Sequence, residues 1–390
     1  MNQSIKVIGV GKNIHLKDSA SPQRITSSVV LDALKDASID FNEIDELYFS
    51  NMMGDILCGV PSMIGQFWLT DVELYGTPVI NVDNACAGGS SALALATASA
   101  KTEPKTVMVV GVEKMRGFES QYVQDSIEQG ILKTQRLGLK EKVNSSVYSK
   151  SLTINMNADW AMEQITQRGT TVRQFASCAL KAHKHASLSI GQTPLQLTVE
   201  DVLNSRVISP PLTRLMCSTF VDGAAAIVIS SKSDFKGPII MESLIEGSVY
   251  DLNYHQQLTK TATKFWNQVS LQPADIDVVE LHDATSPEEL FELECLGFFK
   301  PGEAGIATER GDTSLGGKKV AVNLSGGRVG GGHPLGATGL IQIIELVEQL
   351  RGTATNRQLN NPRFGVSVNI GGVINDSVAC LTIHLLSAFR

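Results

Sequence analysis

Short apolar runs alternate along the chain with small-residue and amphipathic stretches, a pattern that predicts an α/β fold. Residues 107–112 and 224–229 are continuous apolar runs of strand length, which is typical of strands buried on both faces. Residues 92–100 carry alanine at every second position, which suits a helix packed tightly between two layers. Residues 171–187 are a further helical candidate.

The pattern occurs twice in the same order. Residues 38–49 and 270–281 both show a helix end, a turn and an Ile-Asp pair leading into a strand. Residues 86–93 and 333–340 both run through a Gly-containing turn into a helical stretch. Chance similarity of two α/β segments is the alternative, but the shared order favours a duplication. We predict two homologous halves, residues 1–232 and 233–390.

The halves differ in one interval. About a hundred residues separate the strand at 107–112 from the one at 224–229, whereas only a few follow the corresponding C-terminal strand. We therefore predict a loop or lid domain inserted at about 114–207 in the N-terminal half. Inserted lids commonly cover a site and bind the distal part of a large substrate.

Composition narrows the class of protein. At 390 residues the chain is longer than a single core usually allows. Its net charge of −7 argues against nucleic acid as the main partner. No apolar run reaches transmembrane length, and the N-terminus lacks a signal peptide's apolar segment. The six cysteines show no CxxC spacing, so we expect reduced thiols in a cytoplasmic protein, with neither a disulfide framework nor a metal site.

Two residues carry the candidate chemistry. Cys86 and His333 each lie where a strand is expected to run into a Gly-rich helix start. The positive end of the helix dipole should lower the pKa of Cys86 below the ~8.5 of a free thiol and favour the nucleophilic thiolate. A histidine elsewhere in the chain can complete a Cys–His pair. If the halves pack about a pseudo-twofold axis, the two residues converge on one pocket; a buried inert cysteine and a structural histidine are the alternatives.

Several motifs now occur in order with plausible spacing. They are the turn at 84–93, Glu280-Leu281-His282-Asp283-Ala284, the glycine loop at 323–339, Asn369-Ile370-Gly371-Gly372, and the segments 111–115 and 222–226. Together they resemble the thiolase superfamily over nearly the whole chain. The greatest similarity is to sterol-carrier-protein-2-type and archaeal-type thiolases, which carry a His-Asp motif where other thiolases carry Asn-Glu. The resemblance implies a duplicated five-layer α-β-α-β-α fold, acyl-CoA thioester substrates, and a homodimer or a homotetramer built as a dimer of dimers.

The resemblance also implies roles for individual residues. Cys86 would take the acyl group as a thioester, and His333 would deprotonate it. His282 would contribute to an oxyanion site for the acceptor enolate. The backbone N–H groups of Cys86 and Gly372 would form the other oxyanion hole. Asn323 would shape the pocket wall as a turn residue.

Two lysines are candidates for contacts with the substrate. Lys181 and Lys184 lie where thiolases have a basic stretch in the loop domain, so they could meet a phosphate of CoA through charge-assisted contacts. A solvated helix face is at least an equal alternative. No resident cofactor is expected, because the CoA or acyl-carrier-protein thioester is itself the substrate.

The chain differs from the family at the residue that acts as the general acid and base. The family generally uses a second cysteine near the substrate's α-carbon, and its two positions are occupied here by Ala284 and Asn369. Neither residue can exchange a proton at neutral pH, so this function is absent unless another residue substitutes. The remaining trio Cys86, His282 and His333 is similar to the Cys-His-His set of decarboxylating ketosynthases.

The acidic residues after the His-Asp motif have two interpretations. Pro287 is typical of a first helical position, which makes Ser286 the expected cap and Glu289 its capping-box partner. A catalytic carboxylate at Glu288 or Glu289 is the less favoured alternative.

The leading hypothesis is an acyl-CoA-dependent acyltransferase or condensing enzyme with a covalent Cys86 thioester. Claisen condensation or thiolysis through a substitute base, decarboxylative condensation and acyl transfer all remain open. The second hypothesis is a non-catalytic acyl-CoA-binding or scaffold subunit of a multi-enzyme complex. We also expect the subunits to pair through a sheet-edge strand at 107–112 and the Cys86 loop, since an apolar edge strand would otherwise promote aggregation.

Overall fold

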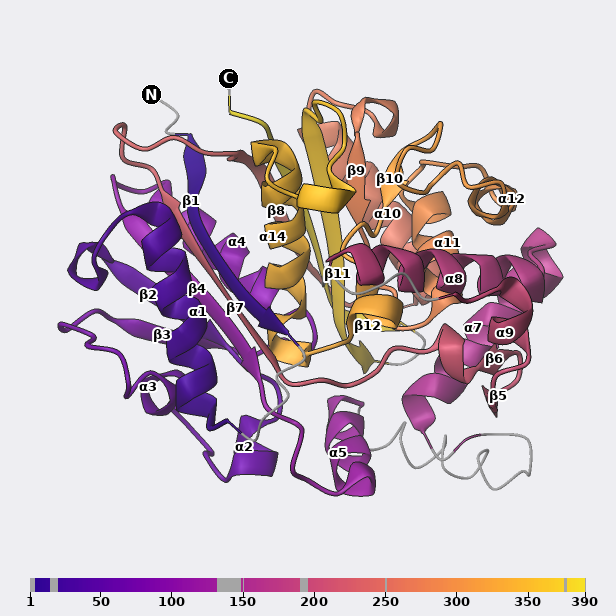
Figure 1. Ribbon diagram of the computed structural model, residues 1–390, viewed down its shortest axis with the longest axis horizontal. Coiled ribbons are helices and arrows are strands. Elements are labelled where there is room, and N and C mark those ends of the chain that lie inside the picture. Colours follow the sequence, from indigo (N-terminus) through magenta and orange to yellow (C-terminus); the bar gives the residue numbers. More distant parts are fainter. Residues whose placement is uncertain are drawn as a thin grey trace.

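The computed structural model describes residues 4–14, 20–131, 149, 151–189, 196–249, 251–374 and 377–389 (Figure 1). Ten strands form one hydrogen-bonded sheet in the order β10-β9-β11-β12-β8-β1-β7-β4-β2-β3, and β5 and β6 form a separate two-stranded sheet. The strands before residue 232 are β1 (Ile5–Ile14), β2 (Glu46–Ser50), β3 (Val79–Val82), β4 (Thr106–Glu113) and β7 (Gly223–Ser230). Those after it are β8 (Ile239–Gly247), β9 (Val278–Glu280), β10 (Ala321–Val322), β11 (Phe364–Ile374) and β12 (Ser377–Ser387).

Each set of five strands has the same spatial order. Counted along its own sequence, the order in either set is third, second, fourth, fifth, first. The two sets are joined only where β1 meets β8, through the pairs Ile5 with Ile240 and Lys6 with Ile239. The sheet is therefore two similar five-stranded sheets that touch at one corner, as a duplicated fold requires. The precise boundary at residue 232 stays a prediction.

Helices cover and separate the two sheets. The N-terminal helices are α1 (Pro22–Ala37), α2 (Gly54–Cys58), α3 (Ile64–Trp68) and α4 (Gly88–Ala100), and the C-terminal ones are α10 (Tyr254–Gln268), α11 (Ser286–Cys295), α12 (Glu303–Glu309), α13 (Gly327–Gly331) and α14 (Thr338–Arg351). Single 3₁₀ turns are η1 (Phe41–Glu43), η2 (Glu128–Gly130), η3 (Arg214–Met216), η4 (Pro273–Asp275), η5 (Leu335–Ala337) and η6 (Thr355–Arg357). Helices α4 and α14 contact each other and strands of both sheets, and α14 stands between the sheets in Figure 1. With α1 outside one sheet and α10 outside the other, the order of layers is α-β-α-β-α.

The alternation of side chains along β4 explains this layering. Val107 and Val109 belong to the central cluster with Leu93 of α4, whereas Met108 and Val110 point to the opposite face and pack with α1. Because successive strand residues face opposite sides, a strand between two helical layers must be apolar at every position. The continuous apolar run in the sequence is the consequence.

The segment between β4 and β7 packs on the C-terminal half. It contains α5 (Ser120–Ile127), α7 (Leu152–Arg168), α8 (Val172–Ser189), α9 (Val199–Leu203), β5 (Val207–Ser209) and β6 (Leu212–Thr213). Helices α7 and α8 both contact α11, and α8 also contacts α12 and α13. The extra segment thus crosses from its own half and covers the other half. The bounds of the insertion, about 114–207, stay a prediction.

The expected edge strand is not at the edge. Strand β4, which includes residues 107–112, lies between β2 and β7 and pairs with both. Its apolar sequence reflects burial in the sheet interior. The edge strand of the N-terminal sheet is β3, which pairs only with β2 among the described strands.

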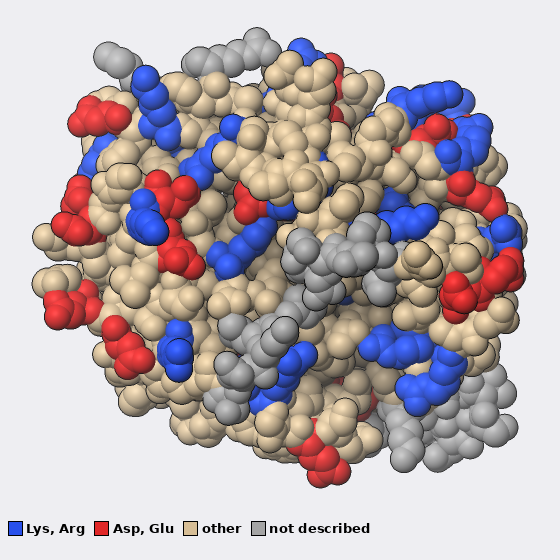
Figure 2. Space-filling model, in the orientation of Figure 1, with Lys and Arg blue, Asp and Glu red and all other residues tan. Residues whose placement is uncertain are grey.

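The outer surface carries mixed charge. Lys and Arg are interspersed with Asp and Glu over the face shown in Figure 2, consistent with the modest net charge of −7. Among the described residues, no helix combines the length and the apolar character needed to cross a membrane.

Replacing Gly111 by alanine should destabilise the fold. A Cβ at this position of β4 would lie 2.5 Å from the carbonyl oxygen of Gly336 and 2.9 Å from the Cα of Ala337, both backbone atoms. Overpacking of this kind typically costs about 1–3 kcal/mol, so chemical denaturation should show a loss of that size for Gly111→Ala. Gly247→Ala is the matched control, because nothing lies within 4 Å of its Cβ position. Equal stability of the two variants would contradict the close contact.

Candidate active site

The turn that carries Cys86 is strained and tightly bonded. Ala85 adopts the left-handed conformation with φ 50°, which is unfavourable for a residue with a Cβ. The carbonyl of Asn84 accepts the N–H of Ala87 at 3.0 Å, and the carbonyl of Ala85 accepts the N–H of Gly88 at 3.0 Å. Helix α4 begins at Gly88. The turn therefore places Cys86 two residues ahead of the first residue of α4.

A hydrogen-bond chain fixes the proton on His333. Its Nδ1 lies 2.8 Å from Oγ1 of Thr338, and that hydroxyl donates to the carbonyl of Pro334 at 3.0 Å. Since the only hydroxyl proton of Thr338 is used there, its oxygen accepts the proton of His333 Nδ1. In the neutral ring, Nε2 is then unprotonated and can act as a base.

A second chain fixes the opposite tautomer of His282. Gln342 donates its Nε2 to the carbonyl of Val368 at 3.0 Å, so its Oε1 accepts Nδ2 of Asn369 at 2.7 Å. The same Nδ2 lies 3.3 Å from Nδ1 of His282 and donates to it. The proton of neutral His282 is therefore on Nε2, which makes this ring a donor.

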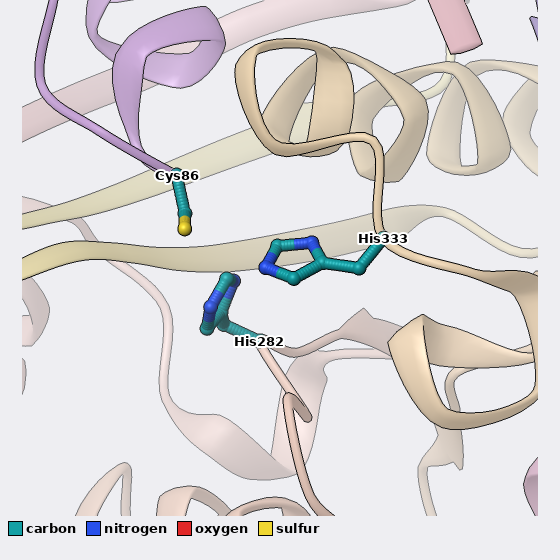
Figure 3. Close-up of side chains that lie close together, drawn as sticks. All are labelled: Cys86, His282 and His333. Atoms are coloured by element: carbon teal, nitrogen blue, oxygen red, sulfur yellow. The ribbon is translucent and has the colours of Figure 1, made fainter. Parts of the chain in front are cut away.

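The three side chains meet in one place. One ligand-type atom from each of Cys86, His282 and His333 lies within 4.8 Å of those of the other two. The two rings are edge to face, with centroids 5.0 Å apart. Figure 3 shows all three side chains pointing toward one another from three separate segments of the chain. A thiol, a ring with an unprotonated Nε2 and a ring with an Nε2–H are thus brought together from distant parts of the sequence.

The trio lies in a largely apolar pocket. Beside it, Gly372 lines the cavity with a positive φ of 65°, between the β11–β12 pairs Gly371 with Cys380 and Val373 with Val378. Helix α7 of the inserted segment supplies Ile154, Met156 and Trp160. The other apolar lining residues include Met52, Ile127, Ile131, Phe220, Leu335, Ile370, Val373 and Val378.

Burial dominates the electrostatics of the pocket. It raises the pKa of the Cys86 thiol to about 12, and the nearby carboxylates of Glu113 and Glu288 add to that rise. Burial lowers the pKa of His282 to about 3 and that of His333 well below its usual value, so both rings are neutral at pH 7. The expectation of a thiol pKa below ~8.5 is therefore wrong, because desolvation of the thiol raises its pKa by more than the helix dipole lowers it.

Two carboxylates outside the trio hold its loops in place. Asp283 accepts the backbone N–H of Arg328 at 2.6 Å and so anchors α13, which leads to His333. Glu113 accepts the backbone N–H groups of Met52 and Gly336 at 3.2 and 2.9 Å and ties the loop after β2 to η5. Sequence reasoning assigned no role to Glu113, although a charged residue ending an apolar strand was a usable signal.

Three of the predicted substrate contacts have other surroundings. Asn323 does not line the pocket; it is fully buried, its Oδ1 accepts the N–H of Leu281 at 2.7 Å, and its Nδ2 donates to Glu289. Lys181 is also buried and pairs with Glu289 at 2.5 Å, so a CoA phosphate cannot reach its ammonium group. These two assignments as substrate-binding residues are corrected. Lys184 is exposed on α8 but is not part of the pocket lining.

The cap of α11 is one residue earlier than expected. Thr285 is the N-cap and Glu288 its capping-box partner, with the Glu288 carboxylate accepting the N–H of Thr285 at 2.8 Å. Ser286 is the first helical residue, and Glu289 is turned away toward Lys181. Glu288 also lines the pocket.

The alkylation of Cys86 should depend steeply on pH. Because its pKa is raised to about 12 and His333 is neutral, the thiolate fraction should increase about tenfold per pH unit between pH 7 and 10. Peptide mapping after timed iodoacetamide treatment measures this rate. A rate that levels off near neutral pH would instead reveal a thiolate–imidazolium pair and contradict the desolvated thiol.

The chain is similar to known proteins over most of its length. Residues 7–196 match the family model "Thiolase, N-terminal domain" and residues 247–383 match "Thiolase C-terminal domain-like". The chain is 32% identical to an acetyl-CoA acetyltransferase of Methanothermobacter thermautotrophicus, covering 95% of this chain and 97% of that protein. It is 33% identical to sterol carrier protein 2 of Bos taurus, covering 87% of this chain and 64% of that protein.

A solved structure shows the same fold. The Ltp2-ChsH2(DUF35) aldolase superposes with a TM-score of 0.72 at 23% identity, covering 99% of this chain and 98% of the other. The duplicated α/β fold expected from the motifs is confirmed. On the matches to both family models and these relatives, the chain belongs to the thiolase superfamily.

Proposed function

We propose that this protein is an acyl-CoA-dependent acyltransferase or condensing enzyme that forms an acyl thioester on Cys86. The observation that carries the proposal is the pair of opposite histidine tautomers facing one thiol. His333 presents an unprotonated Nε2 and His282 presents an Nε2–H, each fixed by a hydrogen bond at Nδ1. A scaffold that only binds acyl-CoA needs neither arrangement.

The acylation step uses these groups in turn. His333 removes the proton of Cys86 while the sulfur attacks the thioester carbonyl of the acyl donor. Because the two events coincide, no free thiolate has to form beforehand in the desolvated pocket. The backbone N–H groups of Cys86 and Gly372 would hold the oxyanion that forms on the donor. The Nε2–H of His282 would remain free to donate a hydrogen bond to the thioester oxygen of the acceptor substrate. CoA or an acyl carrier protein leaves as a thiol, and its proton comes from His333.

The pocket wall favours an apolar acyl group. The side chains contributed by α5, α7 and β11 beyond the trio are mainly aliphatic and aromatic, including Ile154, Trp160 and Val373. Burying hydrocarbon against them gains roughly 0.8 kcal/mol per methylene. We infer a substrate with a larger hydrophobic acyl chain than acetyl. A cytoplasmic location, suggested by six free cysteines, is part of the same proposal.

Incubation with acyl-CoAs tests the proposal directly. A panel of acetyl-, hexanoyl- and benzoyl-CoA should give a mass increase on the Cys86 peptide, fastest with an apolar chain. The adduct should be lost in Cys86→Ala and retained in Cys58→Ala, whose thiol is half-buried nearby. His333→Asn should slow acylation by about 10²–10⁴-fold, the usual contribution of general acid/base catalysis. No adduct with any donor would favour the scaffold hypothesis.

We further propose a homodimer that pairs through β3. This edge strand exposes Ile80, and the helices α3 and α4, which contact β3, expose Phe67 and Leu95. An open edge flanked by apolar side chains is a liability in a monomer.

Light scattering at micromolar concentration should therefore give the mass of a dimer or a tetramer. Ile80→Lys should shift that mass toward the monomer, because it places a charge on the edge strand. Met241→Lys, at a similarly exposed apolar residue of β8, is the control and should leave the mass unchanged. A monomeric wild-type protein would contradict the proposal.

A further inference from the structure

Four titratable side chains line the pocket among the described residues: Cys86, His282, Glu288 and His333. The proposed function employs the thiol and both rings. Nothing in the acylation step uses Glu288, although its carboxyl lies near enough to Cys86 to influence the thiol electrostatically. A buried carboxyl facing a reactive thiol without a described cation beside it calls for an explanation.

We propose that Glu288 is the acid/base that exchanges a proton with the substrate's α-carbon, in place of the missing second cysteine. The inference rests on the proposed function. Ala284 and Glu288 line the same pocket, and they are four residues apart at the start of α11. Ala284 occupies a position where the family can carry the second cysteine, and its side chain is small. The longer side chain of Glu288 reaches the same pocket from the first turn of α11.

The hydrogen bonds of the neighbouring polar groups exclude them from this role. Asn369 cannot accept a proton and has its Nδ2 committed to His282 and Gln342. Asn157, which lines the pocket from α7, accepts the hydroxyl of Thr285 at 2.9 Å and donates to the carbonyl of Thr153. Neither amide titrates, so each positions its neighbours.

The surroundings of Glu288 suit proton donation. Its carboxyl is nearly fully buried, and the adjacent acidic groups are Asp283 and Glu292. No ion pair joins it to a Lys or Arg in the described part of the chain, whereas Glu289 pairs with Lys181. Burial, with the charge of Asp283, raises the pKa of Glu288 to about 8. The carboxyl of Glu288 is therefore largely protonated at pH 7, and its pKa is close enough to neutral pH for it to donate and recover a proton.

The proton balance of thiolysis can be written with these groups. Cys86 gives its proton to His333 and attacks the β-carbonyl of a 3-oxoacyl-CoA, and the α–β carbon bond breaks. The bonding pair forms a new C–H bond with the proton of the Glu288 carboxyl, leaving a carboxylate. Incoming CoA then gives its thiol proton to that carboxylate while its sulfur takes the acyl group, and Cys86 recovers its proton from His333. No oxidant or further reactant is needed.

The test compares carbon–carbon cleavage with acylation in the same protein. Thiolysis is measured with acetoacetyl-CoA and free CoA, and exchange of α-hydrogens is measured with acetyl-CoA in D₂O. Acylation is measured as the mass increase on Cys86 with whichever of acetyl-, hexanoyl- and benzoyl-CoA reacts fastest. In Glu288→Gln, which retains the length of the side chain and an oxygen for the cap, the ratio of cleavage to acylation should fall by about 10²–10⁴-fold. Adding Ala284→Cys to this variant should restore part of the loss.

The matched control is the adjacent carboxylate. Glu289→Gln breaks the buried pair with Lys181, so it should lower Tm while leaving the ratio as in the wild type. Glu288→Asp retains a titratable carboxyl group with a shorter reach and should lose less than Glu288→Gln. It also replaces that variant if the amide fails to fold.

An unchanged ratio in both Glu288 variants would overturn the assignment. So would a wild-type protein that acylates Cys86 but neither cleaves acetoacetyl-CoA nor exchanges the α-hydrogens of acetyl-CoA. Absence of the Cys86 adduct itself would instead count against the proposed function.

Discussion

The site depends on a contact between backbones that only glycine permits. The carbonyl of Gly336, in the turn after His333, lies against Gly89 of α4 and Gly111 of β4. A Cβ at either position would come within 2.9 Å of that oxygen. Gly371 makes a similar approach to the carbonyl of Asn84, just before Cys86. These contacts allow turns from the two halves to share one pocket, and they account for glycines that the sequence places beside each catalytic candidate.

Close packing has an electrostatic consequence. Once water is excluded, charged forms are penalised, and the pKa values of the thiol, the histidines and the acidic groups all move toward the neutral forms. The resting site is thus a set of neutral donors and acceptors whose directions are fixed by hydrogen bonds. Charge would develop only when a substrate arrives, and preorganised donors are most effective under those conditions.

The sequence predicted the parts of the molecule that follow from periodicity and motif order. The buried strand at 107–112, the small-residue helix after Cys86 and the proximity of the two halves could all be inferred from spacing. What failed depended on three-dimensional neighbours. The apolar run in β4 could not show whether the strand was at an edge or in the interior. Lys181 looked like a surface lysine because nothing in the local sequence indicated that Glu289 would be its partner.

The tautomers illustrate a further limit of sequence reasoning. Cys86, His282 and His333 were identified as a group, yet their composition alone does not say which ring is a base. That distinction is set by Thr338 and by Asn369 with Gln342, and those chains end on the carbonyls of Pro334 and Val368. Asn369 stands where the family can carry a cysteine, and it also has a role of its own. Its amide donates to Nδ1 of His282, which leaves the ring proton on Nε2 and makes that ring a hydrogen-bond donor. With an amide at 369, His282 has a defined tautomer and no thiol is available there. The proposed proton transfer at the substrate's α-carbon is therefore assigned to Glu288, outside the trio.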